Sequence, residues 1–225
     1  MEFTLFMLRW LHFLAGITWI GILYYFNFVQ TPFFAETEAT VRTGAIQKLV
    51  PRALWWFRWG AMFTFLAGIA IYILRMGEMG GGLFYSSSYG VTITVGGLMG
   101  TLMFLNVWLI IWPNQKIMIA SNQQIKGGGQ ALPEAAAAAP KAGLASRTNV
   151  MFSIPMLFFM GASAHFAHGG LTADKQLALI VALVIIAALE LNAIFGKQGP
   201  LVTVRGVIVS GLALTVVLWA VVQLL

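Results

Sequence analysis

The chain lacks cysteine and is poor in charge. Its 225 residues include no cysteine, which excludes disulfides, thiolate metal sites, iron–sulfur clusters and covalent haem attachment through a Cys-x-x-Cys-His motif. Charged residues make up 9% of the sequence and hydrophobic residues 60%, and the mean hydropathy is +0.86. Such a composition cannot provide a water-soluble surface. We therefore predict a protein whose surroundings are a lipid bilayer.

Long apolar stretches define the fold class. A helix needs roughly 20 apolar residues to cross about 30 Å of hydrocarbon, where backbone groups must hydrogen-bond within the segment. The first stretch lacks the small-residue cleavage site of a signal peptide, so we expect it to remain as a helix. The sequence predicts an all-α integral membrane bundle of six transmembrane helices in one domain, residues 1–225, with helices near 5–29, 54–74, 91–112, 148–166, 176–195 and 204–224.

Positive charge is distributed unevenly between the loops. Only Arg9, Arg75 and Lys175 belong to one side. The other side holds the loops after helices one, three and five, with Arg42, Lys48, Arg52, Arg58, Lys116, Lys126, Lys141, Arg147, Lys197 and Arg205. Because cytoplasmic loops are enriched in Lys and Arg, we predict both termini to be periplasmic in a bacterial inner membrane. The net charge of +6 follows from this topology and does not indicate nucleic-acid binding.

Two connections are long. Residues 117–146 contain a glycine triplet and an alanine-rich run, which predicts a flexible cytoplasmic linker with at most one short helix. In the loop over 32–52, two glutamates precede two basic residues, a pattern that favours a helix lying on the membrane surface. We find no internal repeat that would favour an inverted-repeat transporter.

The three histidines fall near the periplasmic side. His12 in the first predicted helix and His165 in the fourth reach a similar depth, and such residues usually face the bundle interior with a partner. Gly16 and Gly161 lie four residues deeper on the same helix faces, which leaves room for a flat ligand. These residues favour non-covalent haem b with His12 and His165 as iron ligands. Two alternatives stay open: the glycines only permit close helix packing, or the two histidines and His168 hold copper or zinc.

A polar and aromatic layer is predicted on the cytoplasmic side. Arg58 and Glu190 lie inside predicted spans, where an ionisable group is costly unless paired or hydrated, and they are candidates to pair with each other. Stacked indoles, Arg donors and amides together suit a planar anionic or quinone-like substrate. An ordinary interfacial belt of tryptophan and basic residues is the alternative. The candidate substrate ligands are Arg52, Arg58, Asn114, Gln115 and Asn149.

Several strings rich in aromatic and polar residues run through the first four predicted helices: Trp10-Leu11-His12, Trp19-Ile20-Gly21, 24–30, 51–60, Asn106-Val107-Trp108, 111–116, 146–149, 153–156 and 160–165. They resemble the membrane-embedded N-terminal domain of bacterial urate oxidase, also called urate hydroxylase, and the resemblance is less distinct beyond the fourth predicted helix. The resemblance implies a membrane protein that takes electrons from urate, and family members commonly carry a cytochrome c domain after the membrane part. This chain ends at Leu225 without a Cys-x-x-Cys-His motif. A separate periplasmic cytochrome c, or another membrane-complex subunit, would then accept the electrons.

The combined prediction is a membrane haem-b protein that passes electrons from a small reductant, such as urate or a quinol, to a periplasmic acceptor. Arg58 and the amide residues would hold the substrate, and Glu190 would take its proton. A cofactor-free structural subunit and a transporter are the rival hypotheses. His12 and Asn27 are about 22 Å apart along one helix. Either the haem bridges part of that length, a second cofactor is present, or the substrate binds nearer the haem.

Overall fold

The computed structural model describes residues 2–166 and 175–225, and within these ranges all regular structure is helical. The elements are α1 (Glu2–Tyr24), η1 (Tyr25–Gln30), α2 (Thr31–Glu36), α3 (Ala39–Lys48), α4 (Val50–Met79), α5 (Gly81–Ser86), α6 (Ser88–Leu105), η2 (Asn106–Ile111), α7 (Trp112–Lys126), α8 (Ala135–His165), α9 (Lys175–Phe195), η3 (Gly199–Val202) and α10 (Val204–Leu224). The predicted all-α class is confirmed.

The long helices agree with the predicted spans. Among the described residues, five helical stretches are long and apolar enough to cross a membrane: Glu2–Glu36, Val50–Met79, Ser88–Lys126, Gln176–Phe195 and Val204–Leu224. The sixth long helix, α8, has 31 residues and contacts α1, α6, α7, α9 and α10. Because neighbours surround it, α8 can carry polar side chains that a lipid-facing helix could not. Together these helices form the predicted six-helix membrane bundle.

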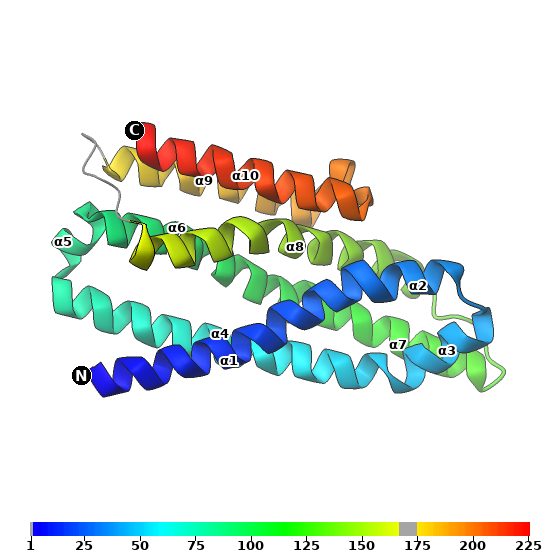
Figure 1. Ribbon diagram of the computed structural model, residues 1–225. Coiled ribbons are helices and arrows are strands. Elements are labelled where there is room, and N and C mark those ends of the chain that lie inside the picture. Colours follow the sequence, from blue (N-terminus) through cyan, green and yellow to red (C-terminus); the bar gives the residue numbers. More distant parts are fainter. Residues whose placement is uncertain (1, 167–174) are drawn as a thin grey trace.

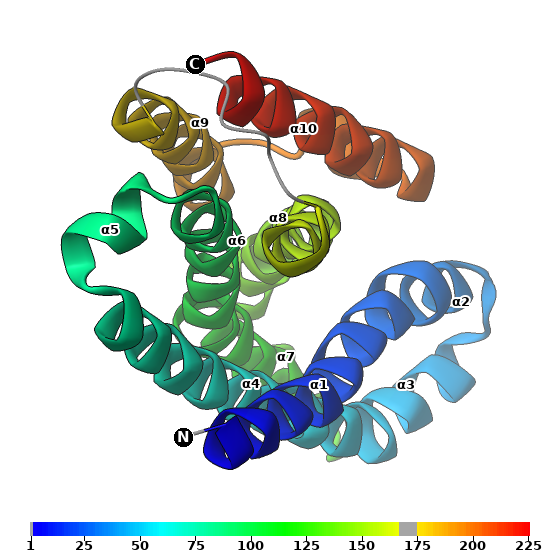
Figure 2. The same ribbon diagram turned by 60° about the vertical axis from the view of Figure 1, so that its left-hand side comes forward.

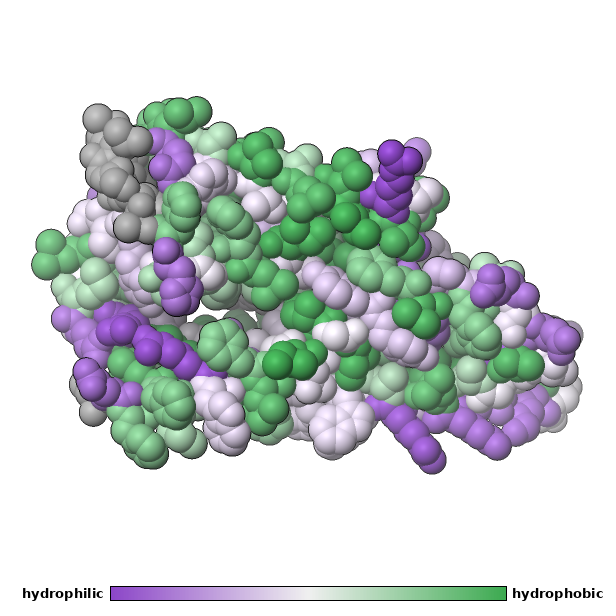
Figure 3. All heavy atoms as spheres, viewed as in Figure 1, coloured by the Kyte–Doolittle hydropathy of each residue, from purple (hydrophilic) through white to green (hydrophobic). Residues whose placement is uncertain are grey.

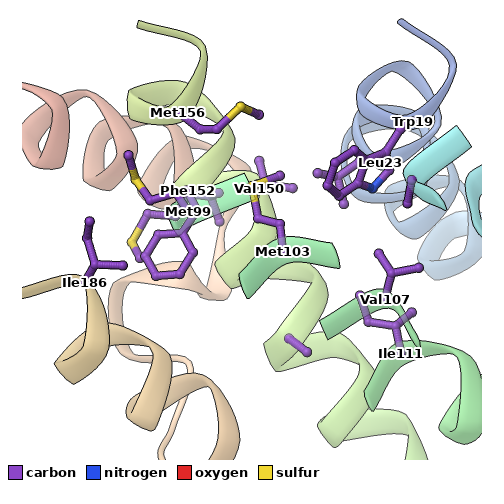
Figure 4. Packing of buried hydrophobic residues seen from close by; sticks show 14 of the residues in the cluster. Trp19, Leu23, Met99, Met103, Val107, Ile111, Val150, Phe152, Met156 and Ile186 are labelled. Carbon is purple, nitrogen blue, oxygen red and sulfur yellow. The ribbon is translucent and has the colours of Figure 1, made fainter. Parts of the chain in front are cut away.

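The helices α6 and α8 form a central layer, with the layer of α1 and α4 on one side of it. The helices α1 and α4 pack along each other as one pair, while α9 and α10 lie against α6 and α8 on the other side (Figures 1 and 2). Buried methionine and aromatic side chains fill the interior. Figure 4 shows Met99, Met103 and Phe152 between α6 and α8, with Ile186 of α9 facing them. The core therefore centres on α8.

Two π-helical turns interrupt the first and third spans, and each one precedes a proline. The backbone N–H of Thr31 bonds Phe26 O before Pro32, and that of Trp112 bonds Val107 O before Pro113, so each bond spans five residues. Proline has no N–H to donate, and its ring clashes with the carbonyl four residues earlier, so the preceding turn widens. The wide turns carry buried asparagines, Asn27 in η1 and Asn106 in η2.

The predicted flexible linker over 117–146 is wrong in its extent. The helix α7 continues to Lys126 and α8 already begins at Ala135, so the connection covers only 127–134. The linker prediction weighed glycine and alanine content, but alanine has the highest helix propensity and its short side chain packs closely. Ala138 and Ala142 are buried, and the Leu132 N–H donates to Ser121 Oγ at 3.0 Å. In the loop over 32–52, a helix does form, as α3.

Both chain ends lie at one end of the bundle, beside the connection from α4 through α5 to α6 (Figure 1). We call this the terminus end. The opposite end, the basic end, holds α2, α3, the end of α7 and the turn between α9 and α10. Of these segments, α3, the end of α7 and the turn carry lysine or arginine, namely Arg42, Lys48, Lys126 and Lys197. The lysine and arginine asymmetry found in the sequence is therefore an asymmetry between the two ends of the folded bundle.

The bundle is hollowed toward the terminus end. In the space-filling view, an opening separates the layer of α1 and α4 from the layer of α6 and α8 (Figure 3), where the ribbons also diverge (Figures 1 and 2). Farther along, Phe65 of α4 stacks on Phe104 of α6 with ring centroids 4.1 Å apart. The α1–α4 pair thus meets α6 through aromatic side chains in mid-bundle, and nearer the terminus end the Tyr72 hydroxyl of α4 still lies 2.7 Å from Thr94 Oγ1 of α6.

Candidate functional site

His12 is held against α4 by one hydrogen bond. Its Nδ1 lies 2.8 Å from Thr64 O, and because a carbonyl only accepts, Nδ1 carries the proton and donates. The other ring nitrogen, Nε2, is then the unprotonated one with a free lone pair. A histidine that ligates a metal is characteristically arranged in this way, with one ring N–H donating to a carbonyl or carboxylate.

The glycine beside the His12 ring is Gly68 and not the predicted Gly16. A Cβ at Gly68 would stand 3.0 Å from His12 Cε1, so only glycine leaves the ring its present place. Gly16 instead faces Thr64, whose Cγ2 would lie 3.7 Å from a Cβ there. The sequence pattern within one helix could not reveal Gly68, since the contact joins two helices.

His165 lies in the last turn of α8, and its side chain is exposed. That end of α8, yellow-green in Figure 1, is at the terminus end, as is the start of α1. His12 follows in the third turn of α1. A Cβ on Gly161 would meet nothing within 4 Å, so this face of α8 is open, as the glycine argument predicts. Both predicted ligands therefore lie in the half of the bundle that contains the terminus end. His168 lies outside the described residues.

A buried hydrogen-bond network joins three helices in the other half of the bundle. Asn106 Nδ2 donates to Asn149 Oδ1 at 2.9 Å and to Glu190 Oε2 at 3.2 Å, and Asn149 Nδ2 donates to Met103 O at 3.0 Å. All three polar side chains are at most 8% exposed. The carboxylate of Glu190 is therefore held by an amide donor and not by a cation.

Arg58 belongs to a separate cluster of cations and indoles. Its guanidinium carbon lies 3.5 Å from the Trp112 ring centroid and 5.7 Å from that of Trp108, and Lys116 Nζ lies 5.5 Å from Trp112. Arg58 Nε donates to Leu54 O at 3.2 Å. The buried Trp108 Nε1 has no acceptor. We call these four residues the arginine–indole cluster; it offers several N–H donors and a flat aromatic surface.

The predicted polar layer is divided in the structure. The suggested pairing of Arg58 with Glu190 does not occur, because each has the other partners described above. Arg52 is exposed and lines a shallow depression of about 380 Å³ with Pro51, Trp55 and Trp56. Asn149 lies in the buried network. Asn114 and Gln115 follow Trp112 on α7, where the Asn114 amide donates to Ile110 O of its own helix at 2.7 Å.

Sequence reasoning missed two polar pairs that tie the first span, α1 and η1, to α8. Asn27 Nδ2 donates to Ser146 Oγ at 2.9 Å, and the Tyr24 hydroxyl lies 2.8 Å from Ser153 Oγ. Together with Asn149, the two serines form one stripe on α8, at spacings of three and four residues. That spacing was a usable signal, although nothing in the sequence assigns the partners.

These features define a class of protein: a multi-pass α-helical membrane protein with polar sites inside the bundle. A family model described as urate oxidase N-terminal matches residues 82–223, more than half of the chain. The chain therefore belongs to the urate oxidase N-terminal family, which confirms the resemblance found in the sequence. The matched range contains Asn106, Asn149 and His165, whereas His12 and Arg58 precede it. No curated protein and no solved structure matches the chain.

Proposed function

We propose that this protein is a membrane haem-b oxidoreductase of the urate oxidase type, which takes electrons from urate on the cytoplasmic side and passes them to a periplasmic cytochrome c. The observation that carries the proposal is the His12 hydrogen bond to Thr64 O, which leaves one imidazole nitrogen available inside a membrane span. Membership of the urate oxidase N-terminal family supports urate as the substrate.

The residues at the terminus end fit a haem. His12 offers a ligand nitrogen fixed by its backbone acceptor, Gly68 leaves the ring its space, and Gly161 keeps the His165 face of α8 open. The hollow between the two layers lies toward the same end (Figure 3). We assign His12 and His165 as the iron ligands. The bound group would supply a one-electron iron couple, whose potential depends on the ligands and on exclusion of water.

The arginine–indole cluster suits the substrate. Urate is a planar anion at neutral pH, so an indole face can stack on it while Arg58 and the Trp108 N–H donate to its oxygens. Asn114 and Gln115 extend the set of amide donors along α7. We leave Asn149 and Arg52 out of the proposed substrate site, because Asn149 bonds within the buried network and Arg52 lines the separate shallow depression.

Glu190 is the proposed proton acceptor. Oxidation of urate releases protons together with electrons, and a carboxylate in the bundle core can take one without a charged partner nearby. Asn106 donates to both Asn149 and Glu190, so it would position the carboxylate. Charge neutralisation by the incoming proton is favourable in an apolar core, since burial disfavours the ionised form.

The proposed orientation places the basic end in the cytoplasm and the terminus end in the periplasm of a bacterial inner membrane. The arginine–indole cluster then faces cytoplasmic urate, and the histidines face a periplasmic cytochrome c or another subunit of a membrane complex. This arrangement follows from the rule that cytoplasmic loops are rich in Lys and Arg.

The test is reduction of the purified protein by urate in nanodiscs, followed by absorption spectroscopy. We expect a Soret band that shifts on addition of urate and a pyridine haemochrome typical of haem b. Reduction by a quinol but not by urate would reject urate as the substrate, while the electron-transfer role would stand. A protein isolated from haem-replete cells without iron porphyrin would instead be a cofactor-free structural subunit.

A further inference from the structure

Two arginines lie on the His12 side of the bundle, closer to the terminus end than His12 itself. Arg9 precedes His12 by three residues on α1, so it lies about one turn outward on the same face. Arg75 follows Gly68 by seven residues on α4, which is two turns outward on the face that contacts the His12 ring. Both side chains therefore extend from the faces that border the histidine.

Tyr89 of α6 brings these two arginines together. The Tyr89 hydroxyl lies within electrostatic reach of Arg9, Arg75 and Glu78. The helices α1, α4 and α6 thus each carry one polar side chain in this region of the terminus end. Figure 3 shows hydrophilic residues beside the hollow at this end of the molecule. We call Arg9, Arg75 and Tyr89 the arginine–tyrosine group.

This group contains more donors than acceptors. Arg75 Nη1 bonds Glu78 Oε2 at 2.8 Å, the one salt bridge among residues 2–166 and 175–225. Arg75 Nε is buried without an acceptor, and a buried N–H without an acceptor costs about 1–3 kcal/mol. Arg9 brings a second positive charge. An anion bound here would satisfy both the charge and the unused donor.

We propose that Arg9, Arg75 and Tyr89 form the carboxylate-binding end of the cofactor site and hold the haem propionates. This inference rests on the proposed function. Haem b has two propionates on one edge of an otherwise apolar ring, and guanidinium groups bind carboxylates with paired N–H donors. The phosphate of a lipid headgroup offers similar chemistry at the membrane surface, so the experiment must separate the two anions.

The test compares haem with its dimethyl ester, which keeps the ring and iron but lacks both carboxylates. Haem-free protein in nanodiscs would be titrated with each compound, for the wild type, Arg9→Gln, Arg75→Gln and Tyr89→Phe. The affinity of each arginine variant for haem should be lower than that of the wild type by a factor of about 10 or more, because the loss of one hydrogen bond to a charged group typically has an effect of this size. The ester should bind the wild type and variants alike. The low-spin spectrum should persist because His12 and His165 are intact.

Two further variants complete the design. Glu78→Gln removes the competing carboxylate of Arg75 and should retain or tighten haem binding, whereas a merely structural ion pair would predict weaker binding. Arg205→Gln, at the basic end, is the matched control and should behave as wild type. The midpoint potential of the bound haem should be lower in Arg9→Gln and Arg75→Gln than in the wild type, since loss of a nearby cation favours the oxidised iron.

Equal wild-type affinities for haem and its ester would overturn the propionate assignment while leaving a haem protein, and dependence on anionic lipid would then indicate the headgroup. Failure of the wild type to bind either compound at its histidines would overturn the proposed function as well. Equal loss of both compounds in the arginine variants would show that the arginines act on the fold and would also reject the assignment.

Discussion

At the scale of single residues, the structure gives the histidines different surroundings. His12 is half-buried, hydrogen-bonded to Thr64 O and packed on Gly68, whereas His165 is exposed at the end of α8. We expect His12→Ala and His165→Ala each to abolish low-spin haem, because each removes one axial bond, and His168→Ala to retain it. Absorption and electron paramagnetic resonance spectra provide the measurement. Equal loss in all three variants would favour a three-histidine copper or zinc site.

Arg58 provides the second prediction at this scale. The Arg58→Leu variant should lower the affinity for urate by roughly one to two decades, because a hydrogen bond to a charged group is typically worth about 1.5–3 kcal/mol. The haem spectrum should not change, since the histidines lie in the other half of the bundle. Stopped-flow reduction at increasing urate concentrations gives the affinity. Arg205→Leu, an exposed arginine of α10, is the control, and an equal effect in both variants would contradict a specific role for Arg58.

At the scale of elements, the π-helical turn η2 places Asn106 between α8 and α9. Replacement by alanine leaves Asn149 Oδ1 and Glu190 Oε2 without this donor inside the bundle. We expect Asn106→Ala to lower the free energy of unfolding by about 1–3 kcal/mol. The comparison variant is Asn114→Ala, whose amide bonds only a carbonyl of its own helix and whose loss should cost less. Thermal unfolding in detergent measures both, and equal stability would show that the network contributes little.

Helix contacts at glycine offer a second test of the elements. A Cβ on Gly211 would stand 2.9 Å from Met151 O and 2.5 Å from Ile154 Cδ1, so α10 approaches α8 closely only because glycine is there. Gly211→Ala should destabilise the bundle by about 1–3 kcal/mol, the usual cost of overpacking. A Cβ on Gly21 would meet nothing within 4 Å. Because alanine has a greater helix propensity than glycine, Gly21→Ala should leave the stability of the bundle unchanged or increase it. Unfolding midpoints of the two variants would decide this.

At the scale of the whole molecule, the prediction concerns orientation. Both chain ends lie at one end of the bundle and the basic loops at the other (Figure 1). A phosphatase reporter fused after Leu225 should therefore be active, because this enzyme folds only in the periplasm, and a fluorescent reporter that requires the cytoplasm should be dark. The opposite result would place the histidines at the cytoplasmic face and the arginine–indole cluster at the periplasmic one.

The family match and the proposed site cover different parts of the molecule. The matched range, 82–223, covers α6 to α10, whereas α1 and α4 precede it and pack along each other as a pair. His12 and Arg58 belong to that pair. A site between the two layers therefore requires residues from both sides of the boundary.

The sequence by itself determined the membrane class, the number of long helices and the distribution of charge between the two ends. These properties follow from composition and apolar length, which act locally along the chain. It also identified His12, His165, Arg58 and Glu190 as unusual. An ionisable residue in an apolar span is energetically costly whichever face of the helix carries it. The bounds of α9 and α10 agree closely with the predicted spans for the same reason.

Which residues meet depends on how the helices pack in three dimensions. The His12 ring lies on Gly68 of another helix, Arg58 stacks on Trp112 instead of pairing with Glu190, and Asn106 bridges Asn149 and Glu190. These contacts depend on how helices rotate and cross, and a π turn changes that rotation beyond what regular helical periodicity predicts. The alanine-rich start of α8 shows the same limit, because its helical state is supported by packing against neighbours that composition does not reveal.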